Sequence, residues 1–161
     1  MHPQKQHPAS VAHAPICVSA GARPFLLAAP SRPTTPKVAR DFVRAVLRHT
    51  DLAPLTDTAV LLTSEAVTSA HLRTPRCAEI LLRLLTAPHG LRISVHDEAP
   101  VRLPAQAGPP PGDPLDAPVA GEPETDHGLL LTGHLADDWG TTPFAGVPRS
   151  TSLWFELHTG R

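Results

Sequence analysis

The sequence contains no tyrosine, and other aromatic residues, methionine and cysteine are scarce. Its 161 residues include 4 Phe, 2 Trp, 1 Met and 2 Cys. Leucine, valine and alanine must therefore form most of the hydrophobic core, and a chain of this length can enclose one in a single domain. Because Cys17 and Cys77 lie far apart, we expect reduced thiols in a cytoplasmic protein rather than a disulfide framework.

The chain also lacks a strong charge of either sign and any long apolar run. Its formal net charge is -1, so neither nucleic acid nor an anionic membrane is expected as a direct partner. No apolar segment approaches the roughly 20 residues that a membrane-spanning helix requires. Proline is abundant instead, with 20 residues concentrated near the N-terminus and in residues 100–123. Ordered structure should therefore lie between and after these two regions.

The composition suggests one domain with a long insertion. Residues 1–24 are expected to form a disordered or loosely attached N-terminal segment, and residues 25–161 a single domain. Within it, residues 100–127 are rich in Pro, Gly, Asp and Glu and poor in core-forming side chains. A stretch of this length and composition is typical of a disordered segment or of a flexible lid over a binding site.

The first part of the domain should contain a short strand followed by two helices. Residues 16–18 are expected to be a short extended piece, and residues 25–27 a strand. Thr35 and Pro36 form a helix start, and apolar residues at helical spacing continue it to about residue 49. The second helix should extend from about residue 56 to residue 72, with no Gly or Pro inside it.

Two apolar runs then predict a β-hairpin. Residues 78–85 and 91–95 are separated by a turn-rich segment, residues 86–90, which should form a five-residue loop. A helix is the competing interpretation of residues 78–85, but the nearness of the next strand argues against it.

After the insertion, we expect one more helix and a closing strand. The helix should extend from about residue 129 to residue 138, followed by a turn at Trp139-Gly140. Phe144 is a candidate strand start, and residues 151–157 form the last clear strand. Helices grouped against an antiparallel or mixed sheet make a two-layer α+β sandwich.

The second predicted helix carries the most informative polar pair. Glu65 and Ser69 are four residues apart, so both lie on one helix face, one turn from each other. A carboxylate with a neutral oxygen one turn later can serve a metal-bound phosphate. A polar stripe at the edge of an amphipathic helix is the simpler interpretation of this stretch alone.

Four short motifs occur in order around the proline-rich insertion. They read Glu-Ala-Val-Thr-Ser-Ala at 65–70, Val-His-Asp-Glu-Ala-Pro at 95–100, Asp-His-Gly-Leu at 126–129 and Thr-Ser-Leu-Trp-Phe at 151–155. In this order they resemble the motifs of the GHKL (Bergerat-fold) ATPase superfamily. The branch they resemble most is that of the anti-sigma-factor serine kinases, small ATP-binding regulatory proteins of actinobacteria. The resemblance covers about residues 25–157.

The resemblance implies a fold, cofactors and partners. The fold would be the histidine kinase-like ATPase domain, a two-layer α/β sandwich of the α+β class with a mixed, mostly antiparallel sheet. ATP and Mg²⁺ would be the cofactors. The partners would be a sigma factor, whose transcription activity is regulated, and a STAS-type anti-anti-sigma protein, which is phosphorylated on serine. The family also forms homodimers.

The resemblance also implies roles for individual residues. Glu65 would be the general base towards the acceptor hydroxyl, and Ser69 occupies the position of the magnesium ligand. Asp97 would accept a hydrogen bond from the adenine amine, with Ala99 near the position of a frequent family glycine. If these residues have no functional role, Glu65 is simply an exposed helix glutamate and Asp97 a solvated turn aspartate.

The remaining implied contacts lie after the insertion. Gly128 and Leu129 open a helix whose backbone N–H groups would face phosphate. Ser152 would touch a phosphate or the adenine edge. If these residues have no functional role, Gly128 is simply a turn glycine and Ser152 a hydroxyl on the strand surface.

Two departures from the family pattern leave a second function open. Ser69 replaces the family's magnesium-binding Asn, and Asp126 replaces the first glycine of the third motif. A non-catalytic, pseudokinase-type module that sequesters a protein partner is the alternative. A metal-binding protein is a third interpretation, since His134 and Asp138 are four apart on a predicted helix. The 10 histidines are otherwise scattered without zinc-site spacing, so exposed histidines are the simpler explanation.

Overall fold

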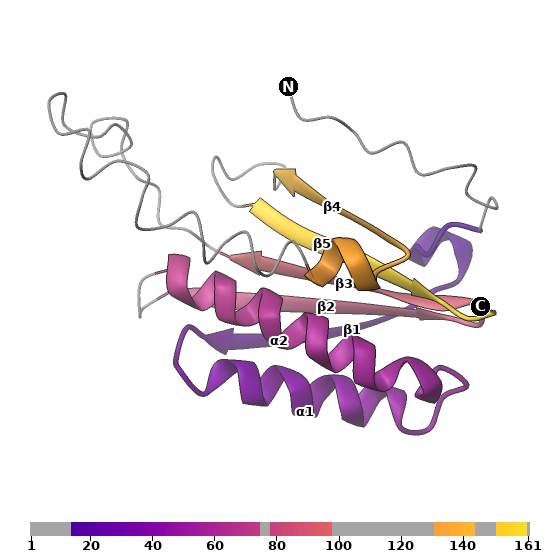
Figure 1. The fold of residues 1–161 in the computed structure, drawn as a ribbon, viewed down its shortest axis with the longest axis horizontal. Coiled ribbons are helices and arrows are strands. Elements are labelled where there is room, and N and C mark those ends of the chain that lie inside the picture. The colour runs from indigo at the N-terminus through magenta and orange to yellow at the C-terminus, as the bar shows by residue number, and fades with distance from the viewer. Residues whose placement is uncertain (1–13, 75–77, 98–130, 144–150, 161) are drawn as a thin grey trace, which may run out of the picture.

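A computed structural model describes residues 14–74, 78–97, 131–143 and 151–160 of the chain (Figure 1). In these ranges the strands form one sheet, and the two long helices pack side by side on it. The elements are η1 (Val18–Ala20), β1 (Arg23–Pro30), α1 (Thr35–Leu47), η2 (Ala53–Leu55), α2 (Thr56–Arg73), β2 (Glu79–Ala87), β3 (Gly90–Asp97), β4 (Asp138–Pro143) and β5 (Thr151–His158). A helical turn over residues 131–135 precedes β4.

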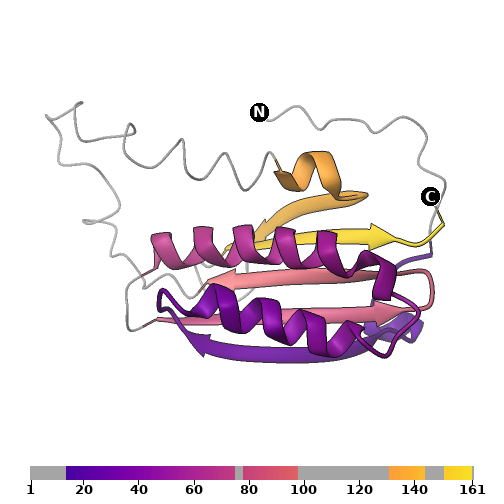
Figure 2. The same ribbon diagram turned by 60° about the horizontal axis from the view of Figure 1, so that its bottom comes forward.

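The five-stranded sheet has the order β1-β2-β3-β5-β4, and every neighbouring pair is antiparallel. Both long helices cover one face of this sheet, so the described chain is a two-layer α+β structure (Figures 1 and 2). The prediction of a mixed sheet is wrong for the described strands. Two successive antiparallel helices join β1 to β2, so β2 re-enters the sheet antiparallel to β1, and no described connection is a parallel crossover.

The two predicted helices are confirmed within two residues at each end. In α1 a proline occupies the first turn, and Ala39, Val43 and Leu47 are buried at intervals of four. Beneath them the core continues into α2, where Leu62 and Val67 are fully buried. Packing of these apolar stripes holds the helix pair against the strands.

The predicted hairpin is confirmed, but its loop is shorter than expected. Ala87 pairs with Gly90, so only Pro88 and His89 connect β2 to β3. Turn-forming residues occupy all of residues 86–90, but the first two and the last of these positions still pair as strand residues. The glycine at the start of β3 is required by the neighbouring strand, because a Cβ on Gly90 would collide with the carbonyl oxygen of Leu157 in β5.

The region after the insertion differs more from the prediction. The described helix ends at residue 135, and Trp139 and Gly140 lie inside β4 instead of forming a turn. Trp139 packs against the main core, and Gly140 lies under the ring of Trp154. His134 and Asp138 therefore do not share one helix, while the candidate strand start at residue 144 is outside the described residues.

A second, smaller core lies on the sheet face opposite the helices. It consists of Ile16, Ala22 and Leu85, with Ala87 packed against it. The expected extended piece at residues 16–18 is instead a buried Ile16 followed by the single 3-10 turn of η1. The segment just before β1 therefore packs on the sheet, although the expected N-terminal segment of residues 1–24 begins outside the described part.

None of the helices in the described ranges combines the length and the hydropathy that crossing a membrane would require.

Candidate functional site

The polar residues of α2 divide between two sides of the helix. On the side of α1, Ser64 accepts a hydrogen bond of 2.8 Å from Arg40. Towards the sheet, the guanidinium of Arg73 lies 3.0 Å from Oδ2 of Asp97, at the end of β3. The C-terminal ends of α2 and β3 lie at the same end of the molecule, as Figure 1 shows. α2 therefore has a surface facing β3 that is separate from its contact with α1.

Two of the predicted site residues precede Arg73 along α2. Glu65 and Ser69 precede it at intervals of four residues, so the three form a stripe along the helix that turns by about 40° at each step. Both Glu65 and Ser69 are half-buried. With a rise of 1.5 Å per residue, the stripe extends about 12 Å from Glu65 to Arg73. The stripe leads from the middle of α2 to the carboxylate of Asp97.

Asp97 is a buried acidic residue at the end of β3. It is 3% exposed, and it shares the helix-facing side of β3 with the buried Ile93 and Val95. Its Oδ2 is paired with Arg73, but its Oδ1 is buried without a hydrogen-bond partner among the described residues. An unsatisfied buried acceptor costs roughly 1–3 kcal/mol, and more when it is charged. Oδ1 is therefore a buried acceptor whose hydrogen-bonding capacity is unused among the described residues.

Arg73 compensates the buried charge of this carboxylate. Its side chain is 43% exposed, while that of Asp97 is only 4% exposed. Removing one partner of a buried ion pair leaves an uncompensated charge, which typically costs about 3–5 kcal/mol. Arg73 was not predicted as a site residue from the sequence. Its position four residues after Ser69 could have pointed to it, but its contact with Asp97 depends on how α2 packs on β3.

A hollow opens at the other end of the same side of α2. Its volume is about 400 Å³, and Leu55 and Thr58 line it from the start of the helix. Residues from the 131–135 turn and the end of β5 complete it: Leu135, Asp137, Leu157, His158, Thr159 and Gly160, with Asp51 and Pro54. Thr58 precedes Glu65 by two helical turns. Along α2, the stripe of Glu65, Ser69 and Arg73 thus lies between this hollow and Asp97.

Ser152 lies on the opposite face of the sheet. It pairs with His96 across β3 and β5, and it is buried. Alternate residues of a strand point to opposite faces, and Phe155 belongs to the helix-side core. Ser152 and His96 therefore face away from the helices, and the structure does not bring Ser152 together with Asp97.

The remaining predicted site residues lie outside the described residues. These are Ala99, Gly128 and Leu129, together with Asp126 and the predicted lid. Their roles stay predictions. Within the described ranges, no three or more His, Cys, Asp or Glu residues are grouped so that they could hold a metal ion.

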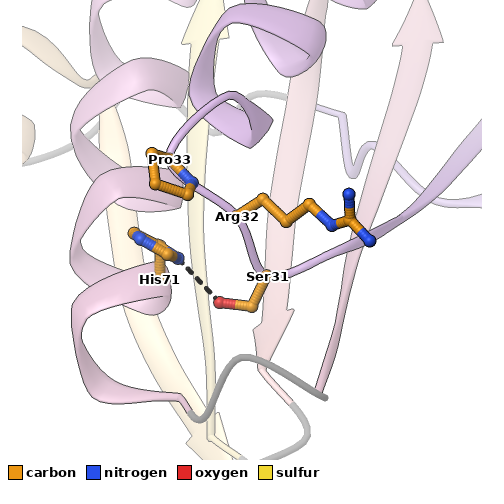
Figure 3. A pocket seen from close by; sticks show the side chains of 4 residues that line it. All are labelled: Ser31, Arg32, Pro33 and His71. Carbon is orange, nitrogen blue, oxygen red and sulfur yellow. Dashed lines mark hydrogen bonds between the residues drawn. The ribbon is translucent and has the colours of Figure 1, made fainter.

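A second polar cluster joins the end of β1 to the end of α2. Thr74 Oγ1 donates to the carbonyl oxygen of Ala70 at 2.8 Å, so it accepts from Ser31 Oγ at 2.9 Å. Ser31 then accepts from Nδ1 of His71 at 2.8 Å (Figure 3). This order of donors assigns the Nδ1–H tautomer to His71. Because Ser31 is completely buried, the cluster stabilises the contact between the end of β1 and the end of α2 and does not present an accessible nucleophile.

The same cluster borders a hollow of about 530 Å³ lined by Ser31, Arg32, Pro33 and His71 (Figure 3). Ser31, Arg32 and Pro33 precede α1, and His71 lies on the side of α2 away from Arg73. Neither this hollow nor the one beside Thr58 includes Glu65, Ser69 or Asp97 among its lining residues.

No protein-family model matches the chain, and no curated protein matches it either.

Proposed function

We propose that the chain binds ATP with Mg²⁺ along the β3-facing side of α2, as a regulator of the anti-sigma-factor serine kinase type with a Bergerat fold. The observation that carries this proposal is the buried Oδ1 of Asp97, which has no hydrogen-bond partner in the part of the chain that the structure describes. It lies at the end of the stripe formed by Glu65, Ser69 and Arg73. An exocyclic amine is the kind of neutral donor that such an oxygen lacks.

The residues of the stripe fit the remainder of such a ligand. With the base at Asp97, an extended triphosphate would follow α2 towards Ser69 and Glu65. The Ser69 hydroxyl is an oxygen ligand of the kind that Mg²⁺ accepts, directly or through water. The magnesium ion would neutralise charge on the phosphates. Glu65 would accept the proton of the hydroxyl that attacks the terminal phosphate.

The proposed partners follow from the same assignment. A sigma factor would be bound and held from transcription, and a STAS-type anti-anti-sigma protein would supply the serine that is phosphorylated. The open side of Glu65, which is half-buried, would receive that serine hydroxyl.

Isothermal titration with ATP and ADP, each with and without Mg²⁺, tests nucleotide binding. We expect Asp97→Asn to weaken ATP binding by about tenfold or more, because its amide can turn an N–H towards the ligand amine. Asp41→Asn is the matched control, since Asp41 is exposed on α1 and paired with Lys37. Thermal unfolding of both variants verifies that they are folded. Absence of ATP binding to the native chain at millimolar concentration would overturn the proposal.

A second function is favoured by Ser69, whose side chain is shorter than the family's Asn and carries no amide carbonyl. In this alternative the chain is a pseudokinase-type module that sequesters its partner without phosphoryl transfer. It predicts that Ser69→Asn raises the Mg²⁺-dependent affinity for ATP. Transfer of radiolabel from ATP to an anti-anti-sigma protein by the native chain, lost in Glu65→Gln, would exclude it.

A further inference from the structure

We infer that Arg73 determines which base the carboxylate of Asp97 accepts, favouring adenine over guanine. This inference rests on the proposed nucleotide site and names its specificity-determining residue. It starts from the asymmetry of the carboxylate, whose Oδ2 is occupied by Arg73 at 3.0 Å while Oδ1 has no hydrogen-bond partner among the described residues.

A carboxylate with two free oxygens suits guanine. The N1–H and the N2 amino group of guanine are adjacent donors, and together they can approach both oxygens of one carboxylate. In this chain the second oxygen is already paired with the guanidinium. A guanine placed on Oδ1 would therefore leave one of its two donors without an acceptor, unless it displaced Arg73 from a nearly buried charge. Both outcomes are costly.

Adenine presents a different edge, with the N6 amino donor beside the N1 acceptor. Oδ1 of Asp97 can accept from the amine. The guanidinium of Arg73 carries five N–H donors in a fixed plane, and its side chain is 43% exposed, so it retains N–H groups to donate to a ring nitrogen. Asp97 and Arg73 thus form an acceptor and a donor side by side, which complements adenine.

A purely structural role for the ion pair accounts for only part of the geometry. Fastening the end of α2 to the end of β3 explains the contact between Arg73 and Oδ2. A structural role does not explain why Oδ1 is buried without a hydrogen-bond partner among the described residues. If Asp97 and Arg73 together hydrogen-bond a base, both carboxylate oxygens have a function.

The test is isothermal titration of the full chain with the Mg²⁺ complexes of ATP, GTP and ITP. The native chain should bind ATP at least tenfold more tightly than GTP or ITP. Arg73→Met should reduce the ratio of ATP to GTP affinity by about tenfold, because it frees the second oxygen for guanine. Arg48→Met, on the exposed end of α1, is the matched control and should leave the ratio unchanged.

Arg73→Lys keeps the inference testable if Arg73→Met fails to fold. Lysine retains a positive charge beside Asp97, but its ammonium cannot direct coplanar donors to a carboxylate and a base at once. We expect the ratio of affinities to fall in this variant as well. An unchanged ratio in a folded Arg73 variant, or a native preference for GTP, overturns the inference while ATP binding itself remains. If the native chain binds none of the three nucleotides, the proposed function fails and the inference with it.

Discussion

Thr63 lies in the middle of α2 with its side chain completely buried. Its hydroxyl oxygen has no hydrogen-bond partner among the described residues. Valine has nearly the same shape without the polar atom. We therefore expect Thr63→Val to raise the free energy of unfolding by about 1 kcal/mol, because an unpaired buried hydroxyl is removed. Urea unfolding measures the change.

Thr68→Val is the matched control for this substitution. Thr68 lies on the exposed side of the same helix, so its replacement should change stability by less than about 0.5 kcal/mol. A loss of stability in Thr63→Val comparable to that of a broken hydrogen bond would show that the hydroxyl is paired after all.

His96 gives the chain a component of acid sensitivity. Burial lowers its pKa below the ordinary value of 6.5, and the positive charge of Arg83 adds to this effect, while Asp97 opposes it. Between the lowered pKa and 6.5, the unfolded chain binds more protons than the folded chain. The free energy of unfolding must therefore decrease as the pH falls from about 6.5 to the folded-state pKa, and level off below it.

Urea unfolding of the native chain and of His96→Asn between pH 5 and pH 8 tests this contribution. The native chain should lose more stability on acidification than the variant does, because only the native chain carries this shifted group. Other histidines titrate in both proteins and cancel in the difference. Equal losses in the two proteins would contradict the assigned cause.

At the level of elements, β4 depends on a close approach between a glycine and a tryptophan. A Cβ on Gly140 would lie 2.8 Å from the ring of Trp154 in β5. Gly140→Ala should therefore lower the free energy of unfolding by about 1–3 kcal/mol, because the ring or the strand must shift. Tryptophan fluorescence during urea unfolding reports both the stability and the altered ring environment.

Gly133→Ala supplies the comparison for Gly140→Ala. A Cβ on Gly133 would meet the ring of Trp139 at an ordinary distance of 3.6 Å, and the residue lies in the helical turn. This variant should be neutral or slightly more stable. An unchanged free energy of unfolding in Gly140→Ala would show that β4 does not pack against Trp154 as described.

The elements that could be predicted are those with a strong hydrophobic period. The spacing of Ala39, Val43 and Leu47 defines α1, and alternation around Ile93 defines β3. β4 was missed because Trp139 and Gly140 resemble a turn locally. Its conformation is fixed by the contact of Gly140 with another strand, which local sequence does not encode.

The same limit applies to the candidate site. Helical spacing was enough to place Glu65 and Ser69 on one side of α2, and a motif pointed to Asp97. The face of Ser152 could not be read from alternation, because β5 buries both Ser152 and Phe155 on opposite faces. The pairing of Asp97 with Arg73 could not be predicted, because it depends on how α2 packs on the sheet, and this packing leaves no periodic pattern in the sequence.

For the molecule as a whole, the two faces of the sheet are chemically distinct. The helix side carries the stripe of α2 and the buried Oδ1 of Asp97, which no described residue pairs. The opposite side carries a polar network in which Arg92 stacks on Trp154 at 3.9 Å and pairs with Glu156 at 3.2 Å. His158 lies 3.0 Å from the same glutamate. Nucleotide binding should therefore be separable by mutation from contacts made by the network face.

The most direct test of the central claim is a crystal structure of the chain with a non-hydrolysable ATP analogue and Mg²⁺. We predict that the adenine amine donates to Oδ1 of Asp97 and that the phosphates lie along α2 towards Ser69 and Glu65. A nucleotide bound instead in the hollow beside Ser31 and His71, or no nucleotide at saturating concentration, would contradict the account.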